Sequence, residues 1–155
     1  PGGPSPASAR PAVALPPELR ACVAEGRPCH APQAAPGLPQ AIGLDEVLAA
    51  LTRGGELGCT YAHKRGEPYR RENIFFAYLD QATLSLTDAE RFFRPLLDIC
   101  QDLATSFDYV TAKLVLDPPD CQGLPRAADA DLLVLQLWGR RRLAVRRPLP
   151  RLPVT

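Results

Sequence analysis

The chain has 155 residues, 46% of them hydrophobic and 23% charged, which is the composition of one globular domain of ordinary size. Its formal net charge of +1 gives no overall field that would favour nucleic acid or a membrane surface, and no apolar run approaches the roughly 20 residues of a membrane helix. Proline departs from the average composition, with 18 residues, many of them near the two ends of the chain.

The start of the chain and its cysteines bear on the compartment. The chain begins at Pro1, contains no Met and shows no signal peptide, so we expect a processed or trimmed chain. Its five cysteines are odd in number and irregularly spaced, unlike the even set of a secreted disulfide framework. We therefore expect an intracellular, reducing compartment, with an organelle left open if a targeting peptide has been removed.

Residues 1–40 are predicted to form a Pro-rich extended arm, because ten prolines interrupt any long helix or central strand. One short helix is predicted over residues 18–25, with Pro17 at its start and Gly26 at its end. An arm of this composition should not bury enough apolar surface to order itself. If it is ordered, we expect a partner to hold it, which indicates a stable complex.

Two helices are predicted in the middle of the chain. The first covers residues 44–53 and ends at the Gly-Gly pair that follows it. The second covers about 88–106, because Thr87 and Glu90 have the spacing of a capping box and apolar residues then recur at helical spacing. This apolar face includes Cys100 as a small core residue and predicts packing on a flat surface.

Strands are predicted at residues 74–78, 109–116, 131–138 and 143–145. The first is a compact apolar run, and the second alternates apolar and polar residues until two prolines stop it. The third is a buried run of Leu, Val and Gln, and the fourth would return after a turn as its hairpin partner.

Few residues offer catalytic or metal-binding chemistry. Cys22, Cys29, His30 and Cys59 are ligand types for zinc, but their spacing matches no compact zinc site, so we interpret them as ordinary loop residues. His63 lies in a polar and basic segment that favours a solvated loop, and no serine has a nucleophile-elbow pattern. Two carboxylates, Asp129 and Asp131, could form part of a metal site, but no third ligand is apparent.

A basic cluster without any acid lies near the end of the chain, at Arg140, Arg141, Arg142, Arg146, Arg147 and Arg151. It could contact nucleic acid, an anionic membrane or an acidic protein surface. We favour the interpretation that the cluster is a hairpin turn and edge strand kept soluble by Arg, because no aromatic platform accompanies the charges.

Three segments within residues 73–147 resemble the JmjC-type cupin family, which includes the cupin-like ribosomal oxygenases. They are RPLLDICQDL, LVLDPPDCQGLP and DLLVLQLWGRRRLAV. Members are hydroxylases that depend on Fe(II) and 2-oxoglutarate, and their fold is a double-stranded β-helix, or jelly roll. The resemblance implies an α+β, mostly β chain with a partial jelly roll over residues 41–147, between the arm and a Pro/Arg tail at residues 148–155.

The family's iron is held by a facial triad of two His and one carboxylate. Where members have His-x-Asp, one alignment places Arg126 and Ala128, and another places Ala127 and Asp129. Both alignments lose the His, and neither Arg nor Ala can ligate a metal. The second alignment retains Asp129 as the carboxylate, and Asp129 and Asp131 would be metal ligands only if the alignment were wrong.

Other family positions also differ. Lys113 and Val115 occupy the positions at which members often carry an Asn and a Tyr that face the cosubstrate. Arg141 occupies the position of the Lys that anchors the cosubstrate in the family. The chain ends at Thr155, before the family's second metal His and several barrel strands. The chain would then be either a degenerate homologue or a piece of a longer protein. A half-barrel would also expose sheet edges and one apolar face, so it should need a partner, a dimer or the missing half.

We therefore expect a non-catalytic, cupin-derived structural or accessory subunit of a larger assembly, without a cofactor. Its arm would lie across a protein partner, and Arg140, Arg142, Arg146 and Arg147 would contact acidic surface or phosphate. One alternative is a protein hydroxylase that uses Fe(II) and 2-oxoglutarate. The other is a nucleic-acid-binding protein that uses the basic tail.

Overall fold

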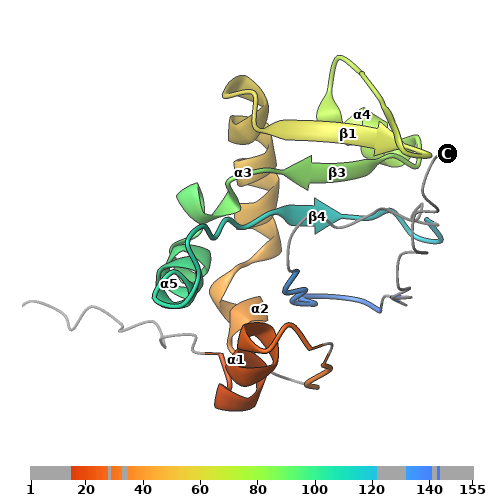
Figure 1. Cartoon of the computed structure of the whole chain (residues 1–155). Coiled ribbons are helices and arrows are strands. Elements are labelled where there is room, and N and C mark those ends of the chain that lie inside the picture. Colours follow the sequence, from red (N-terminus) through yellow and green to blue (C-terminus); the bar gives the residue numbers. More distant parts are fainter. Residues whose placement is uncertain (1–14, 28, 33–34, 122–131, 141–142, 144–155) are drawn as a thin grey trace, which may run out of the picture.

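The structure is a computed structural model that describes residues 15–27, 29–32, 35–121, 132–140 and 143. Its elements in chain order are α1 (Pro17–Ala24), α2 (Leu38–Ala41), α3 (Leu44–Glu56), β1 (Thr60–Lys64), β2 (Glu67–Pro68), α4 (Ile74–Leu79), β3 (Thr83–Leu86), the 3-10 helix η1 (Ala89–Arg91), α5 (Arg94–Leu103) and β4 (Leu114–Leu116). The fold class is α+β, as predicted: a small antiparallel sheet with several helices (Figure 1). Helices contain more of the described residues than strands do, so the expectation of a mostly β chain is wrong for this part.

The four strands are arranged in the order β2-β1-β3-β4, and every neighbouring pair is antiparallel. β1 and β2 form a tight hairpin in which Lys64 pairs with Glu67. The two turn residues between them, Arg65 and Gly66, both have positive φ, which is the conformation of the turn that suits the twist of a two-residue hairpin. β3 lies between β1 and β4 and pairs with both. The sheet thereby brings together β1 and β4, which are far apart in the sequence.

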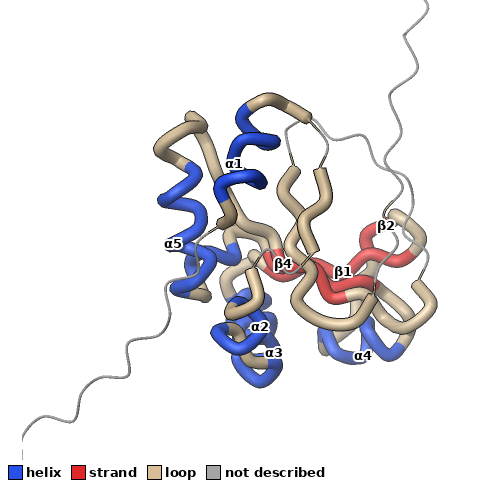
Figure 2. The backbone as a smooth tube through the Cα atoms, turned by 90° about the horizontal axis from the view of Figure 1, so that it is seen from below, coloured by secondary structure: helices blue, strands red, loops and turns tan. Residues whose placement is uncertain are grey.

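The core lies between the sheet and the helices α2, α3 and α4, which gather on one side of the strands (Figure 2). The largest fully buried side chains come from both layers: Leu38, Ile42, Val47, Leu51, Leu84 and Leu86. A direct polar contact also joins the layers, since the Thr60 hydroxyl on β1 donates to the Leu51 carbonyl of α3 at 2.8 Å. Among the described helices, none forms such a layer over the sheet's other face in this view.

Helix α3 begins and continues as its sequence pattern predicts, but it ends later. Its first turn is capped because the Glu46 carboxylate accepts the Gly43 N–H at 3.0 Å. The Gly-Gly pair at residues 54 and 55 does not stop the helix, which ends at Glu56. Gly54 is buried against the sheet, so this glycine serves close packing rather than termination.

Helix α1 confirms the short helix predicted in the Pro-rich arm, with Pro17 at its start and Gly26, at φ +60°, just after its end. Its residue Leu19 is buried, together with Leu15 before it and Leu38 in α2, in the same core as the sheet. This part of the arm is therefore held by the chain's own core. The composition argument failed here because a few leucines bury enough surface to order a short segment.

The apolar run at residues 74–78 was predicted as a strand, and this prediction is wrong: it forms helix α4. The Asn73 side chain accepts the Phe75 N–H at 2.8 Å and caps the helix. A short apolar run cannot be assigned to a strand or a helix by periodicity alone, so the cap was the better signal.

The predicted helix over residues 88–106 is shorter, since α5 begins only at Arg94. The predicted capping box does not form, because Thr87 and Glu90 both make contacts outside the helix. The Thr87 hydroxyl donates to the Cys59 carbonyl at 3.2 Å, and the Glu90 carboxylate accepts the Ala112 N–H at 2.9 Å. Cys100 is buried on the apolar face of α5, as predicted.

The later strands are only partly present. In the segment 109–116, only Leu114–Leu116 pairs, and it stops before Pro118 as predicted. Residues 132–138 form no strand with other described residues, and Leu143 is exposed outside regular structure. No helix in the described ranges has both the length and the apolar character needed to cross a bilayer.

Candidate functional site

The predicted contact and metal residues lie mostly outside the described residues. These are Arg141, Arg142, Arg146, Arg147, Asp129 and Asp131. Arg140 is described and exposed, one position after Gly139 with its φ of +72°. Of the basic cluster, the structure therefore describes one cation, at a turn.

The residues considered for zinc do not converge within the described ranges. Cys22 is buried on α1, Cys29 is exposed, and Cys59 is buried just before β1. No group of three or more His, Cys, Asp or Glu side chains in these ranges could hold a metal ion. His63 was predicted in a solvated loop, which is wrong: it lies on β1, half-buried, opposite Thr83 of β3.

The sheet face that points away from α3 and α4 forms the first candidate site, which we call the open face. Tyr61, Ser85 and Val115 lie side by side on it, because β1, β3 and β4 pair in this register. Tyr61 is 48% exposed and Val115 is 42% exposed, whereas Ser85 between them is only 3% exposed. The row presents an aromatic ring and a branched apolar side chain to its surroundings.

A second, polar row on the open face lies next to the first and includes His63 and Thr83. The Thr83 hydroxyl donates to the Asp117 carboxylate at 2.8 Å and lies 3.6 Å from the Cys121 thiol. The Tyr78 hydroxyl donates to the Asp117 carbonyl at 3.4 Å. These contacts fix the turn at the end of β4. Sequence reasoning missed them because it predicted no strand at residues 83–86.

The residues present do not fit the iron site that the cupin resemblance implies. A facial triad needs two His and one carboxylate around one metal. The chain's histidines are His30, on an exposed segment after α1, and His63 on β1. The two cosubstrate positions also lack the family's side chains, since Val115 is apolar and Lys113 is a cation one residue before β4. No reaction step through iron is therefore derived.

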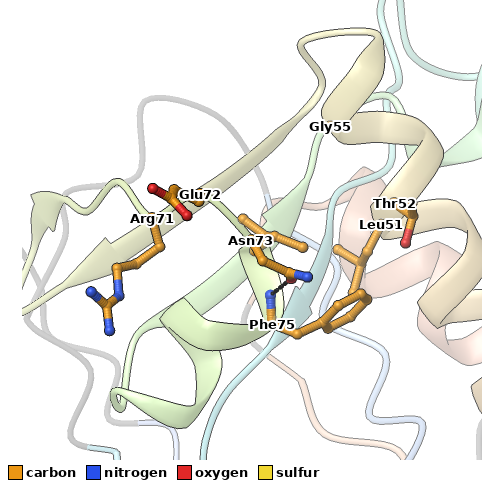
Figure 3. A pocket seen from close by; sticks show the side chains of 8 residues that line it. Leu51, Thr52, Gly55, Arg71, Glu72, Asn73 and Phe75 are labelled. Atoms are coloured by element: carbon orange, nitrogen blue, oxygen red, sulfur yellow. Dashed lines mark hydrogen bonds between the residues drawn. The ribbon is translucent and has the colours of Figure 1, made fainter.

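A shallow groove of about 400 Å³ lies between α3 and the start of α4. Figure 3 shows the Phe75 ring beside Leu51 on its floor, and Arg71 and Glu72 on its rim. The Arg71 guanidinium is already bound to Asp80 at 2.8 Å, and Asn73 is used as the cap of α4. The groove thus offers an apolar floor and the carboxylate of Glu72 on its rim. Its lining residues include no nucleophile in contact with a base.

The segment 132–138 is the last candidate. It alternates like a strand: Leu133, Leu135 and Leu137 pack on the core, whereas the residues between them are exposed. Among those exposed residues, Leu132 is 74% and Val134 is 54% accessible. No backbone hydrogen bond joins this segment to another described residue. Extended backbone of this kind normally finds hydrogen-bond partners in a folded assembly.

Comparison with known proteins adds no relative. No protein-family model, no curated protein and no solved structure matches the chain. The cupin resemblance and the functions that it implies therefore stay predictions.

Proposed function

We propose that this chain is a non-catalytic, cupin-derived accessory subunit that binds a protein partner by strand addition. The observation that carries the proposal is the segment 132–138, which has the side-chain alternation of a strand and an outward apolar row. Exposed apolar rows and unpaired extended backbone are the two features that strand addition uses. The partner would supply an extended strand.

The chemistry of this partner follows from the side chains of the segment. Leu132, Val134 and Trp138 would pack against apolar residues at alternate positions of the added strand. Arg140 lies exposed at the next turn, so an acidic residue at the corresponding end of the partner strand would complement it. A partner with this pattern is a protein rather than nucleic acid.

The fold supports a cupin origin for the subunit. A jelly roll is built from two antiparallel sheets, and the four antiparallel strands with helices on one side would supply one of its walls. In that arrangement the open-face row of Tyr61, Ser85 and Val115 would face the barrel interior. The apolar Val115 and the lost His of the His-x-Asp motif support a scaffold role without oxygenase chemistry.

Amide hydrogen exchange of the segment tests the binding mode. In the isolated chain, the amides of residues 132–138 should exchange rapidly, because no described backbone group pairs with them. In the assembly isolated from cells with a tagged chain, the same amides should be protected. The substitution Val134→Asp should remove both the protection and the assembly.

A matched control uses another exposed large side chain. Tyr109 is 84% exposed and lies between α5 and β4, so Tyr109→Asp should leave the assembly intact. Slow exchange of residues 132–138 in the isolated monomer would contradict strand addition. Separately, stoichiometric binding of Mn(II) and 2-oxoglutarate in anaerobic calorimetry would contradict the non-catalytic role and restore the hydroxylase alternative.

A further inference from the structure

The segment 132–138 itself has the features that its partner strand needs. Its outward row carries apolar side chains at alternate positions, at Leu132, Val134 and Trp138. The sequence places an acidic residue, Asp131, directly before the segment and a basic residue, Arg140, shortly after it. A strand that packs on this row needs apolar residues at the same spacing and an acid at the end that meets Arg140. A second copy of the segment meets both requirements.

The charges at the two ends select the direction in which two such segments would pair. In a parallel pair, the acidic ends of the two copies would meet each other, and so would the basic ends. In an antiparallel pair, the acidic start of each copy lies beside the basic end of the other. Like charges opposite one another destabilise a strand pair, whereas opposite charges stabilise it. The antiparallel pair is therefore favoured at both of its ends.

The two rows of side chains determine the register. Three leucines pack on the core, at Leu133, Leu135 and Leu137, and in a continuous sheet they must lie on the same face as the leucines of the second copy. The register that overlaps the whole segment places the two copies of Leu135 opposite each other, on a two-fold axis. On the outward row, Leu132 then lies opposite Trp138 of the second copy, and Val134 lies opposite Gln136 of the second copy.

We propose that the partner strand is the segment 132–138 of a second copy of this chain, paired antiparallel about a two-fold axis. This inference rests on the proposed strand addition and names its partner. The pairing would give hydrogen-bond partners to backbone groups that have none in another described part of the chain. Such an interface uses the same surface on both copies, so it closes at two chains and does not grow into a fibre.

The oligomeric state of the full chain is the first test. Two short strands form a small interface beside the roughly 1,600 Å² of a standard complex, so the dimer should dissociate on dilution. Sedimentation velocity should show monomer at low concentration and dimer at high concentration. Amides of residues 132–138 should exchange rapidly in the monomer and become protected in the dimer.

Disulfide trapping tests the register. Val134→Cys and Gln136→Cys are made separately in a chain that carries Cys29→Ser, because Cys29 is exposed and would react as well. The two variants carry different tags, are mixed in equal amounts and are oxidised, and the linked peptides are identified by mass spectrometry. The mixed disulfide should exceed each like disulfide by clearly more than the roughly twofold excess of random pairing, because opposite Cβ atoms lie about 5 Å apart and diagonal ones lie farther apart.

Matched variants separate the possible outcomes. Val134→Asp puts a charge into the apolar row of both copies and should abolish the dimer, whereas Tyr109→Asp should leave it unchanged; both positions are exposed, so the fold is kept. A dimer that survives Val134→Asp, or random pairing of the two cysteine variants, would overturn the self-pairing. A chain that stays monomeric at every concentration, with rapid exchange at residues 132–138, would also overturn it but would leave strand addition to a different protein intact. Slow exchange in the monomer would contradict strand addition itself.

Discussion

Gly54 of α3 lies directly against Leu86 of β3. A methyl group at Gly54 would overlap Cδ1 of Leu86 and the hydroxyl of Thr60, so only a glycine lets the helix lie this close to the sheet. A glycine inside a helix costs about 1 kcal/mol relative to Ala. The packing of α3 on β1 and β3 offsets this cost, because it brings Leu51 into the core.

The adjacent glycines should respond to alanine in opposite ways. Gly54→Ala should destabilise the chain by about 1–3 kcal/mol, because the buried methyl overpacks the helix–sheet contact. Gly55→Ala should stabilise it by about 0.4–1 kcal/mol, since no atom outside the helix lies within 4 Å of the new methyl. Urea unfolding of both variants measures this difference, and equal shifts would contradict the close packing.

The ion pair between Arg20 and Asp102 joins α1 to α5, and both side chains are more than one-third exposed. Because solvent screens it, the pair should contribute only about 0.2–1 kcal/mol. A double-mutant cycle with Arg20→Ala and Asp102→Ala should measure this coupling energy by urea unfolding. The exposed pair of Arg94 and Asp98 within α5 gives the comparison, with about 0.3–0.5 kcal/mol expected for such helical spacing.

Asn73 determines where α4 begins. Asn73→Ala removes the acceptor of the Phe75 N–H and should lower the free energy of unfolding by about 1 kcal/mol. Asn73→Asp keeps an acceptor at the same place and should retain most of that stability. If both variants unfold at the same urea concentration, the side chain does not act as a cap.

Tyr69 should make the stability depend on pH in the alkaline range. Its hydroxyl donates to Asp80 at 2.9 Å, and this hydrogen bond, followed by burial, raises the pKa of Tyr69 above its ordinary value. The contribution is therefore fully present below the ordinary tyrosine pKa of about 10, and is lost as the pH rises through the raised pKa.

Absorbance titration of tyrosine ionisation measures the effect. The titration should include a late step above the ordinary tyrosine range, and Tyr69→Phe should remove this late step while leaving the Arg71–Asp80 ion pair in place. The stability difference between the two chains should shrink as the pH rises. A late step that persists in Tyr69→Phe would assign it to another tyrosine.

Local signals in the sequence were sufficient for part of the fold. Helix α3 follows from its apolar spacing, and α1 follows from Pro17 at its start and Gly26 after its end. Pro118 stops β4, and Cys100 lies on the buried face of α5. Each of these features depends on a residue's own backbone preference or on neighbours within one or two turns.

The contacts between distant segments were not predictable in this way. Thr87 and Glu90 have the spacing of a capping box, yet their partners are Cys59 and Ala112, outside the helix. Thr83 meets Asp117 only because β3 pairs with β4. A side chain or short strand with several possible partners takes the one that the whole core favours.

The sequence by itself determined the α+β class and the helices with strong local signals. Only the tertiary structure decided which strands pair and which side chains share the open face of the sheet. The physical reason is that backbone preferences act over a few residues, whereas strand register and burial depend on contacts between residues far apart in the chain.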